Sequence, residues 1–302
     1  MKDDKIFITS ATRTAVATIG KTLKNISAEK LGSCVIDNLL KKSNIDPDEI
    51  DEIIMGQVLT GGAGQNPARQ AAIKSGIPKE KPAFVVNQVC GSGIRSIASG
   101  YQSIKSKDSK IVIAGGQESM SLAPHAIHLR DGKKLGDKEL IDTMIRDGLW
   151  DAFHGYHMGV TAENVAEKFQ VTREEQDRFA LKSQEKALSA QKQGKFKEEI
   201  VNYIIKSKKS EVNFNKEEHP REGTRFESVS RLKPVFKNEG TVTAGNASGI
   251  NDGAAAVILM NSETADKKGL EKLVSIKSWA SCGVDPALMG TGPIPSSKKA
   301  LN

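Results

Sequence analysis

The chain has 302 residues, of which 38% are hydrophobic and 5% aromatic, and it carries a formal net charge of +7. This length and apolar content suffice for one large globular domain or two ordinary ones, and no apolar run approaches the roughly 20 residues that span a bilayer. Because lysines alternate with acidic residues and few aromatic residues accompany them, the charge does not indicate a nucleic-acid surface; a small polyanionic ligand matches the mild basic excess.

The first 117 residues alternate between strand-like and helix-like segments. Apolar periodicity predicts strands at 5–14, 48–59, 82–90 and 110–117, and helices at 27–44, 66–77 and 91–107. Strands separated by helices favour parallel pairing, because each crossover returns the chain to the same end of the sheet. We therefore expect an α/β unit with a mostly parallel sheet that helices cover on both faces.

The pattern changes between Glu118 and Thr241. This stretch is richer in glycine, histidine and lysine, and it contains two helical segments, 161–169 and 173–194, without comparable strand alternation. It is predicted to be an inserted, partly helical region.

The last part of the sequence resumes the strand and helix pattern. AAAVILM at 254–260 predicts a buried strand that returns to the first sheet, and a short helix at 263–270 precedes a second long strand at 273–285. A final helix start at Pro293 is followed by too few residues for a stable isolated helix, so we expect that the chain lacks a C-terminal portion. The predicted division is an N-terminal α/β half at 1–117, an inserted loop domain at 118–241, a return to the first half at 242–268 and an incomplete C-terminal half at 269–302.

The three cysteines, Cys34, Cys90 and Cys282, are too few and too scattered for a disulfide framework or a zinc site. They are predicted to be reduced thiols. The N-terminal MKDDKIFIT has neither a signal-peptide core nor a transit pattern, so a cytoplasmic location is expected.

Cys90 lies at a predicted strand-to-helix turn in NQVCGSGIRS. The positive end of a helix dipole favours a negatively charged sulfur there, and Gly91 and Gly93 allow the backbone and a ligand to come close. Free cysteine is also among the most commonly buried residues. The pattern therefore leaves two interpretations, a nucleophile and a small core residue.

The sequence around this cysteine resembles the thiolase family. NQVCGSGIRS is similar to the family's acyl-thioester motif, and four further segments match in family order: GGQESMS, DAFHGYHMGVTAENVA, EGTVTAGNASGINDGAAA and GVDPALMGTGPIP. The resemblance implies that Cys90 is the nucleophile. It also implies a layered αβαβα architecture, with the first half complete and the second half largely missing.

The likeness is greatest to the biosynthetic acetyl-CoA acetyltransferases, and it implies reversible condensation of two acetyl-CoA to acetoacetyl-CoA and CoA. These thioesters are substrates, and no cofactor or metal is implied. The family takes its acid/base and oxyanion groups from Asn-Glu-Ala-Phe, Gly-His-Pro and a Gly-rich cysteine motif. None of these occurs in the sequence, and Cys282 in SWASCGVD is not assigned the second role.

The resemblance also implies contacts to CoA. His157 and Met158 correspond to positions beside pantetheine, Ser248 to a partner of a pantetheine amide, and Ala244 and Ala247 to the lining of the tunnel. Arg221 and Ser228 correspond to positions near the adenine and its phosphates, and Leu149, Phe236 and Met289 to the apolar pocket. Each has a structural alternative: a loop histidine bonded to the backbone, a turn serine, a solvated charged loop or a core residue.

The segment with His125 and His128 resembles the family's tetramerisation loop, which implies a homotetramer of the full-length protein; a metal site is the alternative for these two histidines. Neither nucleic acid nor a membrane is an expected partner. Two other functions stay open. One is a degradative 3-ketoacyl-CoA thiolase, and the other is a catalytically silent CoA-binding or assembly subunit.

Overall fold

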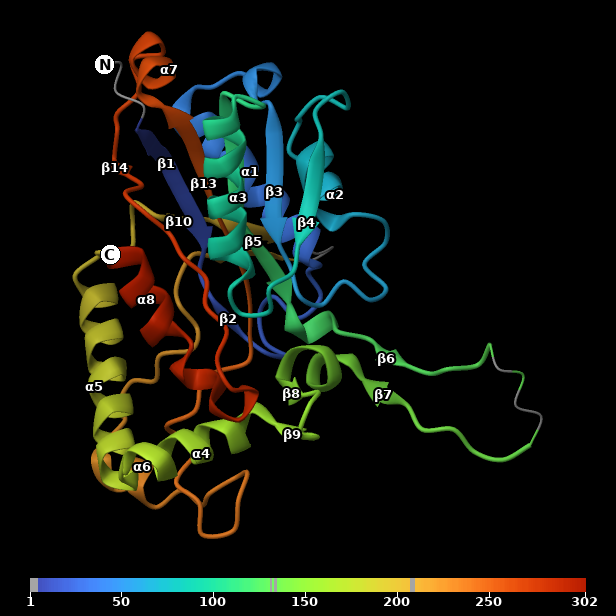
Figure 1. Cartoon of the computed structure of the whole chain (residues 1–302), viewed down its shortest axis with the longest axis vertical. Coiled ribbons are helices and arrows are strands. Elements are labelled where there is room, and N and C mark those ends of the chain that lie inside the picture. The colour runs from blue at the N-terminus through green and yellow to red at the C-terminus, as the bar shows by residue number, and fades with distance from the viewer. Residues whose placement is uncertain (1–4, 131, 133–134, 207–209) are drawn as a thin grey trace. The chain divides into compact units, whose positions relative to one another are not determined.

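The computed structural model describes residues 5–130, 132, 135–206 and 210–302 (Figure 1). The chain forms two compact units. Unit 1 comprises residues 1–144, 197–217 and 251–277, and unit 2 comprises 145–196, 218–250 and 278–302.

Unit 1 is built on an eight-stranded mixed sheet with the order β10-β1-β13-β5-β3-β4, in which β14 also pairs with β1 and β2 with β13. The strands are β1 Ile6–Thr14, β2 Ala17–Thr18, β3 Glu52–Gly56, β4 Ala83–Val86, β5 Ile111–Ser119, β10 Ile200–Val201, β13 Asn251–Asn261 and β14 Val274–Ser275. The expected return of segment 254–260 to the first sheet is confirmed, because β13 lies between β1 and β5 (Figure 1).

The expected parallel pairing is confirmed among the strands of the first 117 residues, where β3 pairs in parallel with β4 and β5. The sheet as a whole is mixed, because β13 is antiparallel to both β1 and β5. The register between β13 and β5 shows how β13 comes to run antiparallel, because Asp252 at the start of β13 faces Ser119 at the end of β5. The returning chain therefore enters the sheet at the end where β5 finishes, and it runs back along it.

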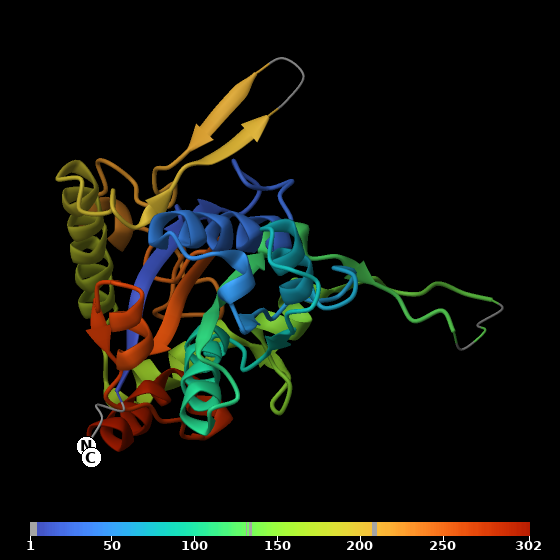
Figure 2. The same cartoon turned by 90° about the horizontal axis from the view of Figure 1, so that it is seen from above.

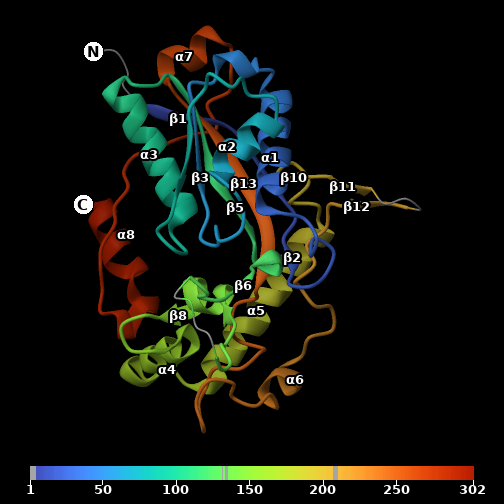
Figure 3. The same ribbon diagram turned by 90° about the vertical axis from the view of Figure 1, so that its right-hand side faces the viewer.

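Helices cover both faces of this sheet, as the sequence predicted (Figure 3). Helices α1 Ala28–Ser43 and α2 Pro67–Lys74 lie on one face, and α3 Ser92–Ser106 lies on the other. Alternate residues of each strand supply the two cores. Ile53 and Ile113 pack on the α1 side, whereas Ile54 and Val112 pack on the α3 side. The shorter helices of this unit are η1 Pro47–Glu49, η2 Met120–Leu122 and α7 Ser262–Lys267.

Two hairpins project from unit 1 (Figure 2). One pairs β6 His125–Ala126 with β7 Ile141–Asp142, and the other pairs β11 Tyr203–Lys206 with β12 Glu211–Phe214. No strand was expected in either segment. In the second hairpin Phe214 is buried and Tyr203 packs against the main core, so the base of the hairpin is anchored.

Unit 2 is mainly helical. Its long helices, α4 Met158–Phe169 and α5 Arg173–Lys192, confirm the two helices expected at 161–169 and 173–194. Its remaining elements are β8 Trp150–Asp151, β9 Tyr156–His157, α6 Phe226–Ser230, η4 Pro286–Thr291 and α8 Pro293–Leu301, and η3 Met144–Leu149 begins at its boundary. Helix α4 packs along η4, where the Asn164 amide donates to the Ala287 carbonyl at 3.1 Å.

The second long strand expected at 273–285 is wrong. Only Val274 and Ser275 form a strand, β14, which pairs with Ile8 and Phe7 of β1. A strand needs a hydrogen-bonded neighbour along its length, and the same edge of β1 is occupied by β10 at Arg13 and Thr14. Among the described residues, no helix combines the length and apolarity that crossing a membrane requires.

Candidate active site

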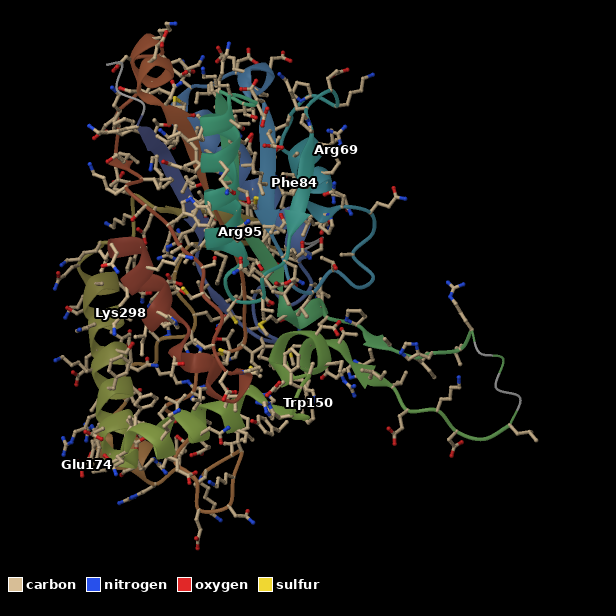
Figure 4. The ribbon with its side chains drawn as sticks, in the orientation of Figure 1. Arg69, Phe84, Arg95, Trp150, Glu174 and Lys298 are labelled. Atoms are coloured by element: carbon tan, nitrogen blue, oxygen red, sulfur yellow. The ribbon has the colours of Figure 1, made fainter. Side chains whose placement is uncertain are left out.

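The turn between β4 and α3 carries Cys90, the cysteine that the sequence analysis singled out. β4 ends at Val86 and α3 begins at Ser92, so that Cys90 lies two residues before the helix, and its side chain is exposed. Figure 4 labels Phe84 on β4 and Arg95 on the first turns of α3, the two elements that this turn joins. The interpretation of Cys90 as a small core residue is therefore wrong.

Backbone strain is concentrated immediately before the cysteine. Val89 has a φ of +47°, in the left-handed region that β-branched residues strongly disfavour. Such a conformation costs about 1–3 kcal/mol and persists only where surrounding contacts enforce it. Here the amides of Gly91 and Ser92 close the turn by donating to the carbonyls of Gln88 and Val89, each at 3.0 Å.

Glycines let α3 begin directly against the sheet. A Cβ added to Gly56 at the end of β3 would lie 2.5 Å from the carbonyl carbon of Ser92 and 2.7 Å from the amide nitrogen of Gly93. Position 56 therefore excludes any side chain unless the helix moves. A Cβ on Gly116 of β5 would lie at an ordinary 3.5 Å from its nearest neighbours.

Cys90 opens into a cavity of about 350 Å³ that lies wholly within unit 1. Its walls come from the ends of β1, β3 and β5, the start of β13 and the first residues of α3. The lining residues are Arg13, Thr14, Val16, Gly56, Gln57, Val58, Val89, Cys90, Ser92, Gly93, Gly116, Gln117, Glu118, Gly253, Ala254 and Ala255. The small residues among them leave the backbone accessible to a ligand.

Glu118 is the ionisable carboxyl group of this cavity. Burial raises its pKa, although its carboxylate accepts the amides of Val58 and Leu59 at 2.8 and 3.2 Å. Beside it, the side-chain amide of Gln117 donates to Gln57 at 2.9 Å. These contacts hold the segment after β3 that forms one wall of the cavity, and none of them was expected from the sequence.

The other thiols of the chain differ from Cys90. Cys34 on α1 is half-buried, and burial, together with the Asp37 carboxylate, raises the pKa of its thiol to about 11. Cys282 is half-buried in unit 2.

Cys34 is expected to react about 100-fold more slowly with iodoacetamide than a thiol of ordinary pKa 9.0, because the thiolate is the reacting form and its fraction is lower by that factor. Peptide mapping by mass spectrometry after timed alkylation measures the rate at each cysteine. The same measurement in urea is the control, where Cys34 should react as fast as Cys282. Equal rates for Cys34 in the folded and unfolded chain would contradict the expectation.

All ten residues that the resemblance associates with CoA lie in unit 2, whereas Cys90 lies in unit 1. Within unit 2, the His157 ring stacks on Phe236 with centroids 4.6 Å apart, and its Nδ1 accepts the Gly159 amide at 3.0 Å to cap α4. Burial lowers the pKa of His157, which favours the neutral ring that this cap needs. Gly159 is required here, since a Cβ would lie 2.2 Å from the Phe236 ring.

The remaining apolar candidates of unit 2 are not core residues. Leu149 closes η3 and Met158 opens α4, both half-buried, and Met289 on η4 is exposed. Arg221 and Ser228 lie in an exposed segment, where the Arg221 amide donates to Gln184 at 2.9 Å and the Ser228 hydroxyl to the Arg225 carbonyl at 2.6 Å. The structure thus joins His157 with Phe236, and it places Arg221 in an exposed loop and Ser228 on the short helix α6.

The loop with Ala244, Ala247 and Ser248 is held by two buried carboxylates. Glu163 on α4, 4% exposed, accepts the amides of Thr241 and Val242 at 2.8 and 2.7 Å and the Thr241 hydroxyl at 2.8 Å. Burial raises the pKa of Glu163, but these hydrogen bonds outweigh it and hold the pKa below its ordinary value.

Asp177 on α5 is the second carboxylate. It is 1% exposed, and it accepts from the Asn246 amide at 2.9 Å and from Arg173 at 2.8 Å. Asn246 in turn accepts the Thr243 amide at 2.8 Å, which shapes the loop from within. This support was not expected from the sequence. The helical spacing could have indicated that Glu163 is buried, because it puts Glu163 on the same face of α4 as Gly159 and Ala166, both of which are buried.

Within the described ranges, no cluster of three or more histidine, cysteine or acidic side chains could hold a metal ion. The fold and the turn instead define an α/β protein that presents one exposed cysteine at the start of a helix, a class that includes thiol-dependent acyltransferases.

Comparison with known proteins identifies the family. Residues 6–263 match the family described as "Thiolase, N-terminal domain". The chain belongs to the thiolase family and has its mixed α/β fold. It is 55% identical to the acetyl-CoA acetyltransferase of Rhizobium meliloti (strain 1021), over all of this chain and 77% of that protein, and 53% identical to the acetyl-CoA acetyltransferase of Shinella zoogloeoides, over all of this chain and 76% of that protein.

A solved structure agrees with these relatives. The crystal structure of the Bacillus anthracis acetyl-CoA acetyltransferase superposes with a TM-score of 0.96 at 40% sequence identity, and the match covers 99% of this chain and 76% of that one.

Proposed function

We propose that this chain is an acetyl-CoA acetyltransferase that carries the acetyl group as a thioester on Cys90. The observation that supports this most is that Cys90 is exposed on a strained turn and lines a cavity whose walls include several glycines and alanines. The similarity to proteins named acetyl-CoA acetyltransferase favours the short-chain branch over a degradative 3-ketoacyl-CoA thiolase.

The chemistry would proceed in two stages. The Cys90 thiolate attacks the carbonyl carbon of acetyl-CoA; a new C–S bond forms, the C–S bond to CoA breaks, and CoA leaves as a thiolate that takes up a proton. A second acetyl-CoA then loses an α-proton. Its carbanion attacks the acetyl group on Cys90, which forms the C–C bond of acetoacetyl-CoA and releases the Cys90 thiolate.

In this proposal the ten candidates of unit 2 bind CoA. His157, Met158 and Ser248 contact pantetheine, Ala244 and Ala247 line the tunnel, and Arg221 and Ser228 contact the nucleotide end. Leu149, Phe236 and Met289 form the apolar pocket. For the full-length protein we also propose a cytoplasmic homotetramer whose contacts involve the β6–β7 hairpin. For this chain we propose the four-part division at 1–117, 118–241, 242–268 and 269–302.

A second candidate function follows from the sequence. It contains no Asn-Glu-Ala-Phe, Gly-His-Pro or second Gly-rich cysteine motif, the segments that supply the acid/base and oxyanion groups in the family. A CoA-binding subunit that accepts an acetyl group without condensation, or that only assembles with other chains, is therefore the alternative.

Acetyl-CoA labelled in its acetyl group separates these functions. The purified 302-residue chain is incubated with it, digested, and mapped for label by mass spectrometry, while acetoacetyl-CoA is measured in the same mixture. Label on Cys90 with product supports the full reaction, and label without product supports the acyl-accepting alternative. An unlabelled chain that also fails to bind CoA in calorimetry would overturn both.

A further inference from the structure

The strained residue before the cysteine is held by side chains on both of its polar groups. The Val89 amide donates to Oδ1 of Asn87 at 2.9 Å, and the Val89 carbonyl accepts the Ser92 hydroxyl at 2.6 Å. The same Ser92 oxygen accepts the amide of Gln88 at 2.9 Å. A single hydroxyl therefore bridges the two residues that precede Cys90.

Ser92 is well placed to act as a rigid support. It is the first residue of α3 and only 4% exposed, so water does not compete for its hydroxyl. Gly56 of β3 lies directly behind it, with no space for even one additional carbon between the strand and the backbone of Ser92 and Gly93. Its position is thus fixed by packing as well as by hydrogen bonds.

The side chain of Val89 contributes little to holding the turn. It is 47% exposed, so no close packing around it enforces the left-handed conformation. A valine free of Asn87 and Ser92 would return to an extended or right-handed conformation, which would redirect the next residue.

We propose that Asn87 and Ser92 are positioning residues that hold Val89 in its left-handed conformation and thereby fix the direction of the Cys90 sulfur into the cavity. This inference rests on the proposed acetyl transfer to Cys90. Neither residue is assigned contact with the substrate. Both act through the backbone, and a small change in the direction of the sulfur is sufficient to slow attack by about 100-fold.

The test compares Ser92→Ala, Ser92→Thr and the double variant Val89→Asn/Ser92→Ala, with Ser106→Ala as a matched control at the exposed end of α3. We call the hydrogen bonds of Asn87 and Ser92 to Val89 the clamp. Hydrogen exchange of the peptide 85–96 measures how firmly the clamp holds the turn, and the rate of acetylation of Cys90 by acetyl-CoA measures its effect on the nucleophile. Unfolding transitions confirm that each variant is folded.

Ser92→Ala should speed exchange in this peptide by about 10-fold or more and slow acetylation by about 10- to 100-fold. Ser92→Thr keeps the hydroxyl, so it should keep most of the protection against exchange and most of the acetylation rate. Val89→Asn should rescue the double variant, because asparagine adopts the left-handed region more readily than valine does, whereas a merely stabilising role of Ser92 would give no such rescue.

The outcomes separate this inference from the proposed function. Unchanged exchange in Ser92→Ala overturns the clamp, and faster exchange with unchanged acetylation overturns its positioning role. A wild-type chain that is never acetylated, while Ser92→Ala still exchanges faster, overturns the proposed function and the positioning of a nucleophile but supports the clamp itself.

Discussion

Cys90→Ala should reduce acetylation of the chain by at least about 10³-fold, because no other group is assigned to form the thioester bond. Affinity for CoA should change by less than about threefold, since the variant removes one sulfur atom and leaves the residues of unit 2 in place. Labelled acetyl-CoA measures the first quantity and calorimetry the second.

Two matched controls accompany this variant. Cys34→Ala and Cys282→Ala remove the other thiols, both half-buried, and should keep acetylation close to that of the wild type. Label retained in Cys90→Ala and lost in either control would assign the acyl-accepting role to another sulfur and overturn the central claim.

Glu163→Gln should lower the free energy of unfolding by about 2–3 kcal/mol at neutral pH. The carboxylate accepts two backbone amides and a hydroxyl in a buried position, and a glutamine amide would turn an NH₂ group toward one of these donors. Urea unfolding measures the change. Glu167→Gln, one turn further along α4, removes an exposed carboxylate that pairs with Lys237 at 3.2 Å and should change stability by less than about 0.5 kcal/mol.

The difference in free energy of unfolding between the wild type and Glu163→Gln should depend on pH. The pKa of Glu163 lies below its ordinary value of 4.5 in the folded chain, so the unfolded chain binds the proton more tightly. The stabilisation is complete above 4.5 and is lost as the pH falls through the lowered pKa. The gap between wild type and Glu163→Gln should therefore narrow on acidification, and a gap that widened below 4.5 would contradict the assignment.

Much of the fold of unit 1 was predictable because its buried residues recur at regular spacing. In α1, Leu31, Val35 and Leu39 follow the helical period, and all are buried. The direction of β13 was not predictable, because a continuous apolar run such as AAAVILM is the same for either direction of pairing. The error at 273–285 has a similar cause: apolar residues indicate a strand, but only a free sheet edge allows one.

In the candidate site, too, local features could be predicted and features that depend on the tertiary fold could not. Cys90 could be located from its neighbouring glycines, because that pattern is local. The left-handed conformation of Val89 could not be predicted, because a β-branched residue after VVNQ favours an extended strand. Glu163 and Asp177 were missed because acidic residues on helices are usually solvated, and only the tertiary fold brings the amides of 241–246 onto them.

The contrast between Gly56 and Gly116 bears on engineering of the proposed acetyl transfer. Both line the cavity of Cys90, but a methyl group at 56 would meet the helix backbone, whereas one at 116 would make ordinary contacts. A substitution at 116 that is meant to change acyl-chain selectivity can therefore reduce the volume of the cavity while the Cys90 sulfur stays in place. A library that diversifies 56 would instead shift the turn that carries Cys90, and selectivity and rate of the proposed acetyl transfer would then change together.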